Sequence, residues 1–452
     1  MKNKVFFGLL SLMLCACSSS KGNAEAEETE EEGLPVINLS EGVEEVKQLN
    51  LSDAVERLEI VKLESTNRSL VRPNTDYMVT DNDIWVMDPL NSLLRFSRQG
   101  KFLNRVGKRG QGPKEYSMLS SFFVDDNAKE VYIQGSSAGG IQVYDYEGNH
   151  IRQQTRRMAD DYYSGEPSTR NPFFRYHDRF FVVQNLAVFK PIANPVDSLW
   201  SIALMDEDFL FAKLFKNPDH VGHENDICLD KNRADPYGET NRTPFQWREL
   251  PHAIDFYGDE MTVMFSNTDT IYRFEEPTLE LVPQYVVETH EPKCGFELMH
   301  QWPSKRERLS YFYFSGYFPT RDYIYLLGQK EGDTYIYQYD KNHGSVKLLR
   351  HKGGIRESRW GSELRYSPID NYFRLTNDFT GGSFKVVSIF SFLTRSQGKY
   401  WFQVLDPGAE EFEDYVEEVK ASPDAPQKQQ LLDVIAKTGE EDNPILLIAV
   451  LK

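Results

Sequence analysis

The stretch "DNDIWVMDPLNSLLRFSRQGKF", residues 81–102, decides the fold because the next segment of the chain repeats it. Its short apolar runs are separated by turn residues, which is the pattern of antiparallel strands joined by tight turns. The segment "NAKEVYIQGSSAGGIQVYDYEGNH", residues 127–150, can be laid over it, so that Phe96 corresponds to Tyr144, 48 residues further on. A sequence period near that length is typical of a β-propeller blade or a similar repeat.

Looser copies of the same unit follow along the chain. The strand pairs that we align with it are 178–183 with 202–206, 258–263 with 269–274 and 321–326 with 335–340, and the least regular unit covers 384–405. A four-stranded blade cannot bury both of its faces alone, so the units must close into a ring. We therefore expect an all-β fold, a six-bladed β-propeller, over residues 49–452.

Ring closure requires the two ends of the chain to meet. The apolar strand candidate at 58–63 and the last apolar run, at about 444–451, are the segments that would latch the first blade to the last. Between blade six and this closing strand, residues 410–437 have a helical pattern with a break near Ser422 and Pro423, because proline cannot continue a helix. We expect a short helical insertion there.

The first residues resemble a bacterial lipoprotein signal. Lys2 and Lys4 precede an apolar run from Val5 to Leu14 that is too short to span a bilayer, which predicts a secretion signal over residues 1–16. The box that ends in Cys17 resembles a lipobox, and the resemblance implies that Cys17 carries the lipid. An ordinary cleaved signal with incidental cysteines is the alternative.

An acidic segment follows the expected anchor. Residues 25–32 contain six glutamates, and such a segment buries nothing and repels itself. We expect residues 17–48 to form a lipidated, disordered tether. An acidic stretch after the lipidated cysteine also resembles the export tags of surface lipoproteins, which implies an outer-membrane protein at the cell surface or facing the periplasm.

Charge and cysteine content limit the alternatives. The net charge of −18 argues against a nucleic-acid partner, which requires a basic footprint. Only Cys228 and Cys294 lie outside the signal and anchor. They could form a disulfide in an oxidising compartment or remain two free thiols, and the sequence leaves both open.

Residues 135–139 match the G-x-S-x-G pattern that presents the nucleophile of many serine hydrolases, with Ser137 at its centre. That pattern needs a strand before the serine and a helix after it. Here the alternating run 141–144 predicts a strand instead. We interpret Ser137 as part of a small-residue hairpin turn and not as a nucleophile.

The stretch "RFSRQGKFLNRVGKRGQGPKEY", residues 95–116, resembles the hallmark of bacterial six-bladed β-propeller lipoproteins related to NHL-repeat proteins. Residues 269–287, 375–382 and 443–452 resemble the same family. The resemblance implies an exported lipoprotein of a glycan-utilising bacterium, and it implies no particular reaction. Lys114 stands where the family usually has glycine, which suggests that this position has a negative φ here.

Polar residues in the family-like loops are the candidate ligand-binding groups. They are Arg109, Gln111, Asn377 and Asp378, and propellers commonly bind ligands through loops at one end of the channel. The alternative is structural: Asn377 and Asp378 would form a turn, and Gln111 would satisfy backbone groups. Exposed aromatic residues such as Trp247, Trp302, Trp360 and Tyr366 could stack on sugars or pack between blades.

Two other kinds of site receive little support. His220 and His223 lie among carboxylates, but their spacing matches no established zinc pattern, so they are weak metal candidates. Gly107, Gly110 and Gly112 lack the Lys-Ser/Thr ending of a phosphate-binding loop. We expect no cofactor, and no catalytic residue can be named.

We therefore expect a membrane-anchored propeller that binds a glycan or a protein partner, such as an outer-membrane uptake protein, in polysaccharide uptake or sensing. A carbohydrate-active enzyme, namely a lyase, glycosidase or lactonase at the channel mouth, is the alternative. A purely structural partner protein is the third possibility.

Overall fold

A computed structural model describes residues 33–452 except 73–74, 89–91, 117–118, 136–139, 156–172, 178, 184–186, 189–199, 207–210, 224–246, 249–252, 266, 294–306, 308, 361–362, 369–371 and 387–397. Residues Pro35–Lys452 form one compact unit, to which the description below applies. Cys17, Ser137, Cys228, Cys294 and Trp302 lie outside the described residues, as do the side chains of Trp247, Trp360 and Tyr366.

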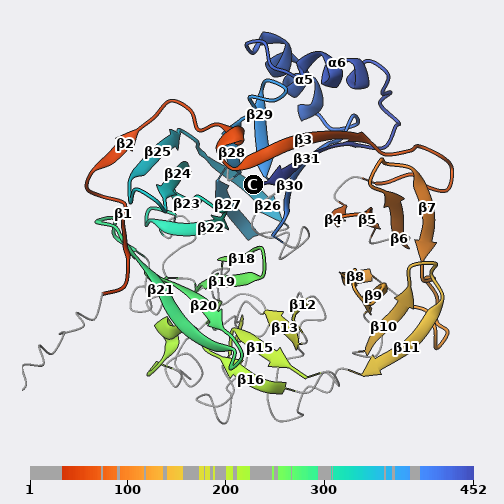
Figure 1. Ribbon diagram of the computed structural model, residues 1–452, viewed down its shortest axis with the longest axis horizontal. Helices are drawn as coiled ribbons and strands as arrows, with labels where there is room; N and C mark the ends of the chain where they lie inside the picture. Colours follow the sequence, from red (N-terminus) through yellow and green to blue (C-terminus); the bar gives the residue numbers. More distant parts are fainter. Residues whose placement is uncertain are drawn as a thin grey trace, which may run out of the picture. The chain divides into compact units, whose positions relative to one another are not determined.

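Five antiparallel sheets of the same form follow one another along the chain, each with its first strand nearest the centre of the ring (Figure 1). Their strands are β4 (Asp76–Val79), β5 (Asp83–Asp88), β6 (Ser92–Ser97) and β7 (Phe102–Val106) in blade 1; β8 (Leu119–Asp125), β9 (Glu130–Gly135), β10 (Gly140–Asp145) and β11 (His150–Thr155) in blade 2; β12 (Phe173–Tyr176), β13 (Arg179–Val183), β15 (Ile202–Met205) and β16 (Phe211–Phe215) in blade 3; β18 (Ala253–Tyr257), β19 (Glu260–Met264), β20 (Thr270–Glu275) and β21 (Glu280–Glu288) in blade 4; and β22 (Tyr313–Pro319), β23 (Tyr323–Lys330), β24 (Asp333–Asp340) and β25 (Val346–His351) in blade 5.

The sixth blade combines both ends of the chain. β28 (Phe373–Thr376) and β29 (Ser383–Val386) form a hairpin, and β29 lies beside β30 (Tyr400–Leu405). β30 pairs with β31 (Ile445–Leu451), which pairs in turn with β3 (Val55–Lys62) from the start of the domain. The six-bladed β-propeller expected from the repeat is therefore confirmed.

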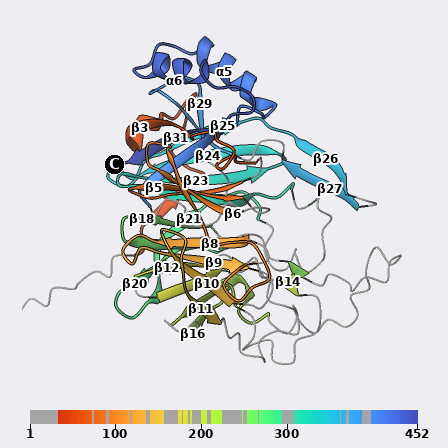
Figure 2. The same ribbon diagram turned by 90° about the vertical axis from the view of Figure 1, so that its right-hand side faces the viewer.

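Two short strand pairs lie outside the blades. β14 (Ala187–Val188) pairs with β17 (Trp247–Arg248), and β26 (Ile355–Trp360) pairs with β27 (Glu363–Pro368). The second pair projects away from the blades (Figure 2).

The strands aligned from the sequence occupy equivalent places in their blades. Phe96 lies on β6 and Tyr144 on β10, each the third strand of its blade, and each follows a shift in strand register. The second and third strands of blades 3, 4 and 5 pair as the alignment requires. The blade repeat is therefore confirmed in its register as well as in its length.

The turn in "RFSRQGKF" holds blade 1 against β3 of blade 6. Gly100 has a φ of +84°, and a Cβ at this position would lie 2.2 Å from the carbonyl oxygen of Lys62 on β3. Arg98 donates to Glu59 of β3 at 2.8 Å, and its guanidinium lies 4.2 Å from the ring centre of Tyr400. Arg98 and Gly100 of the family-like stretch therefore help to close the ring.

Two helices fill the connection between β30 and β31, as expected. α5 (Glu411–Ala421) ends at Ser422, whose backbone is extended ahead of Pro423, and α6 (Lys428–Ile435) follows. Phe412 and Val419 on the apolar face of α5 pack into the same core as residues of β3. The two helices lie together at one edge of the blades (Figure 2). No helix among the described residues is long and apolar enough to cross a membrane.

We expected residues 17–48 to form a disordered tether. This is wrong from residue 36 onward, where the chain pairs with the blades. β1 (Val36–Asn38) pairs with β21 of blade 4, and β2 (Val43–Glu45) pairs with β25 of blade 5, both in parallel. A 3₁₀ turn, η1 (Leu51–Asp53), leads into β3. Residues 35–63, which we call the N-terminal belt, therefore run along the outer edges of blades 4, 5 and 6 (Figure 1).

Two truncations test whether the belt stabilises the fold and the preceding acidic segment does not. We expect that deleting residues 18–33 leaves the melting temperature unchanged. Deleting residues 18–48 should lower it, because Ile37 and Leu39 are 0% and 6% exposed and each loses about 1.5–3 kcal/mol of burial. Differential scanning calorimetry of the two variants measures this, and equal melting temperatures would contradict a structural belt.

Candidate functional site

Arg109 and Gln111 lie in the loop that connects blade 1 to blade 2, and both are exposed. The loop is closed by its own backbone: Gly110 N–H donates to the Tyr116 carbonyl at 3.0 Å, and Tyr116 N–H donates to Lys108 at 3.1 Å. The carboxylate of Glu115 accepts from Gly112 N–H at 3.0 Å. This hydrogen bond, together with Lys108, lowers the pKa of Glu115.

Aromatic packing fixes the base of the same loop. The rings of Tyr116 and Tyr144 meet edge to face at 6.4 Å, and the Tyr144 hydroxyl donates to the Lys114 carbonyl at 3.0 Å. A Cβ on Gly107, where φ is +69°, would lie 2.7 Å from Tyr116. Lys114 is not among the described non-glycine residues with positive φ. The loop is thus a rigid connector that presents Arg109 and Gln111 on its surface.

Asn377 and Asp378 occupy the turn between β28 and β29, and the hydrogen bonds described below stabilise that turn. Asn377 is fully buried, and its side-chain oxygen accepts from the N–H groups of Phe379 and Thr380, both at 3.2 Å. Asp378 accepts from Ser52 N–H of η1 at 3.0 Å. These contacts favour the alternative interpretation of the pair, as a turn that joins the belt to blade 6.

The 106–116 loop and the 377–382 turn make no contact with each other among the contacts that the structure describes. The 106–116 loop packs on Tyr144 of blade 2, whereas the 377–382 turn packs on η1 and on α5. The four candidate residues therefore remain two separate pairs, of which only Arg109 and Gln111 are exposed.

His220 and His223 lie close together after blade 3. His220 is buried at the end of a 3₁₀ turn, η2 (Pro218–His220), and its carbonyl accepts from His223 N–H at 3.1 Å. The neighbouring residues 224–226 are outside the described part of the chain. Within that described part, no group of three or more histidine, cysteine, aspartate or glutamate residues is placed to hold a metal ion.

A different set of residues becomes visible when the blades are compared by strand register. One cross-strand pair, between the first and second strands, is large and apolar or aromatic in four blades. These pairs are Met78 with Trp85, Phe123 with Tyr132, Phe174 with Phe181, and Phe318 with Tyr325. All eight side chains are buried. In blade 4 the same position holds Asp255 and Thr262, which we call the polar pair.

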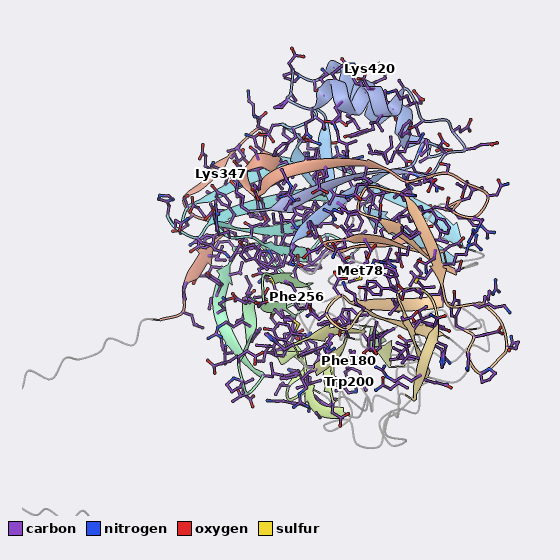
Figure 3. All side chains as sticks on the ribbon, turned by 45° about the vertical axis from the view of Figure 1, so that its right-hand side comes forward. Met78, Phe180, Trp200, Phe256, Lys347 and Lys420 are labelled. Atoms are coloured by element: carbon purple, nitrogen blue, oxygen red, sulfur yellow. The ribbon has the colours of Figure 1, made fainter. Side chains whose placement is uncertain are left out.

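Asp255 lies on β18, the innermost strand of blade 4, and Thr262 lies opposite it on β19, where core side chains are expected. Figure 3 labels Met78, its counterpart in blade 1, and Phe256, the neighbour of Asp255, and both lie in the interior of the ring. The Thr262 hydroxyl donates to the Asp255 carbonyl at 3.3 Å, and Phe256 N–H donates to the Asp255 carboxylate at 2.8 Å. Burial raises the pKa of Asp255 to about 7, against the opposing effect of the Phe256 hydrogen bond.

The polar pair faces blade 5. Tyr317 of β22 is 3% exposed, its hydroxyl hydrogen-bonds to Thr262, and Asp255 is among the charges that act on it. Burial raises the pKa of Tyr317, so this phenol stays protonated. Asp255 as a whole residue is half-buried, whereas its apolar counterparts are buried.

Tyr257 lies beside the polar pair, and Lys341 of blade 5 contacts Tyr257. Tyr257 follows Asp255 by two residues and shares its strand face, and its hydroxyl donates to the Lys452 carbonyl at 2.7 Å. The Lys341 ammonium lies 5.6 Å from the Tyr257 ring centre, and burial lowers its pKa. The arrangement offers a carboxyl group, two hydroxyls, an aromatic ring and a cation between two blades, which suits recognition of a polar ligand.

Sequence reasoning missed the polar pair. The signal was present as a carboxylate between Ile254 and Phe256, inside an apolar strand where an unpaired charge is costly. It became specific only when strand register showed which residues of the other blades occupy the same position.

The raised pKa of Asp255 makes stability depend on pH in a defined direction. The native state retains a proton that the unfolded chain loses near pH 4, so this group's contribution to stability falls as the pH rises to about 7. Asp255→Asn cannot ionise. We expect its melting temperature, relative to wild type, to rise between pH 4 and 7 and then level off. A difference that is independent of pH, measured by thermal unfolding in matched buffers, would show that Asp255 ionises normally.

Comparison with solved structures agrees with the fold. A structure described as a "Putative exported protein" from Bacteroides fragilis NCTC 9343 is 18% identical, with a TM-score of 0.56, and the match covers 92% of this chain and 100% of that one. A member of the DUF4221 family from Bacteroides vulgatus is 8% identical, with a TM-score of 0.45, over 88% and 97%. No curated protein matches the chain.

The family itself is identified over nearly the whole chain. The model described as "Domain of unknown function (DUF4934)" matches residues 34–450, a span that begins just before β1 and ends within β31. The match therefore includes the N-terminal belt as well as the six blades. The chain belongs to the DUF4934 family.

Proposed function

We propose that this protein is an exported, lipid-anchored β-propeller that binds a carbohydrate between blades 4 and 5. The observation that carries the proposal is the polar pair, because Asp255 and Thr262 stand where four other blades bury apolar or aromatic side chains. Replacing such a pair with polar groups costs packing energy. A ligand that uses these groups explains why the cost is tolerated.

The chemistry of the groups favours a carbohydrate over other polar ligands. A carboxyl group and hydroxyls hydrogen-bond well to sugar hydroxyls, and Tyr257 on the same strand face offers an aromatic ring. The net charge of −18 disfavours polyanionic ligands. A neutral glycan is therefore the ligand class that we propose.

Export and anchoring rest on the N-terminal sequence. The signal pattern and the lipobox-like residues before Cys17 support them, and a structure of the same fold is described as a "Putative exported protein". We place the protein at the outer membrane, facing either the surface or the periplasm, as an accessory to glycan uptake or sensing. An uptake protein of that membrane would then be its protein partner.

One observation favours an enzyme as the second candidate. A carboxyl group with a pKa of about 7 is suited to general acid or base catalysis at neutral pH. A glycosidase would also need a second carboxylate about 5–10 Å away in the same pocket. Testing any glycan that binds for cleavage distinguishes the two candidates.

Native gels that contain each of a panel of neutral plant, host and microbial polysaccharides test the proposal. We expect at least one polysaccharide to retard the wild-type protein, and we expect Asp255→Phe/Thr262→Tyr, which restores the pair found in other blades, to abolish retardation. Thr262→Val keeps the side-chain shape and removes the hydroxyl, so it serves where the double variant does not fold.

Arg109→Ala/Gln111→Ala is the matched control, because it removes the two exposed candidates of the 106–116 loop. It should leave retardation unchanged. Loss of retardation in this control, with retention in the polar-pair variants, would move the binding site to the loop. Absence of retardation by every polysaccharide would contradict the carbohydrate proposal and favour a protein ligand.

A further inference from the structure

The first part of the belt is paired with the outermost strand of blade 4. Val36, Ile37 and Asn38 are in parallel register with Val286–Glu288 of β21. The pairing is extended on both sides, by a hydrogen bond from Val286 N–H to Pro35 at 3.0 Å and one from Leu39 N–H to Glu288 at 2.8 Å. Blade 4 therefore gains a fifth strand at its rim.

The second part of the belt is paired with blade 5 after a short connection. Val43, Glu44 and Glu45 are in parallel register with Val346–Leu348 of β25, and Val46 N–H donates to Leu348 at 2.9 Å. Only residues 40–42 separate the two pairings, and all three are exposed. A connection this short keeps the two blade edges close together.

The belt also supplies side chains to the core between the same two blades. Ile37 and Leu39 join one hydrophobic cluster with Met264 of blade 4 and with Tyr317 and Leu326 of blade 5. The rings of Tyr285 and Tyr339 meet in the same region at 6.1 Å. The outer part of this interface is thus apolar and is completed by the belt.

The inner part of the interface differs from its counterparts. Elsewhere the corresponding side chains make ring contacts with the next blade: Trp85 with Tyr146 at 4.9 Å, Tyr132 with Phe180 at 5.3 Å, Phe174 with Phe256 at 5.4 Å and Phe318 with Phe373 at 4.4 Å. Blade 4 has the polar pair there instead. The belt bridges this interface on the outside, as it also bridges the interface between blades 5 and 6, but only the first of the two lacks an aromatic pair on the inside.

We propose that residues 35–45 act as a clamp that holds blades 4 and 5 together at the rim and so positions the polar pair for its ligand. Its effect on ligand affinity rests on the function proposed above, whereas its effect on the interface does not.

Cleavage of the full mature chain at a single inserted protease site tests the clamp. Cleavage between Glu41 and Gly42 disconnects β1, which pairs with blade 4, from β2, which pairs with blade 5, and removes neither strand. We expect cleavage there to speed amide hydrogen exchange in residues 253–264 and 313–319 by about tenfold or more, since the interface opens more often. It should also weaken binding of any polysaccharide that retards the uncut protein.

A matched control cuts the belt between Lys47 and Gln48, which are exposed and lie after the pairing with blade 5. This cut leaves the bridge between blades 4 and 5 intact and should change exchange in the same segments by less than about twofold. Equal effects of the two cuts, or no effect of either, would overturn the clamp. Faster exchange without binding of any polysaccharide would support the clamp and reject the proposed ligand.

Discussion

The pairing of β3 with β31 is the constraint on which the rest of the structure depends. Every blade buries its faces only against its neighbours, so the ring is stable only when the first and last blades are joined. β31 lies between β30 and β3, and five of its seven residues, Ile445–Ala449, are fully buried. To reach this place β3 must come from the N-terminal side, which brings the preceding residues along the outer edges of the blades as the belt.

The blades share one packing rule and one exception. A large side-chain pair near the axis packs against the next blade, and the exposed fraction of these side chains does not exceed 8%. Blade 4 replaces that pair with Asp255 and Thr262. Since an isolated charge is costly in such a place, the carboxyl group keeps its proton up to about neutral pH. The exception combines lost packing with retained polarity at a half-buried residue, and the binding site that we propose rests on this combination.

The blades could be predicted from the sequence because each contains alternating apolar runs separated by turn residues, and the copies at 81–102 and 127–150 align over their full length. The belt could not be predicted. β1 and β2 have three residues each, which is too short for a periodic pattern, and they follow a segment rich in glutamate. The disorder that the glutamates of residues 25–32 indicate was therefore extended too far along the chain, as far as residue 48.

The candidate site was harder to predict for a related reason. Arg109 and Gln111 were named because they lie in a distinctive loop, and both are exposed, whereas Asn377 is buried in a turn. Asp255 has no distinctive sequence neighbourhood, and 69 acidic residues compete with it. Only the strand register, which aligns it with Met78, Phe123, Phe174 and Phe318, shows that it breaks the repeat.

The most direct test of the account is amide hydrogen exchange of the wild-type protein with and without each neutral polysaccharide. The account predicts that a polysaccharide that binds slows exchange in residues 253–264 of blade 4 and 313–319 of blade 5, because the ligand contacts the polar pair and Tyr317. Slower exchange confined to other segments, such as residues 106–116, or no change with any polysaccharide, would contradict a binding site between these two blades.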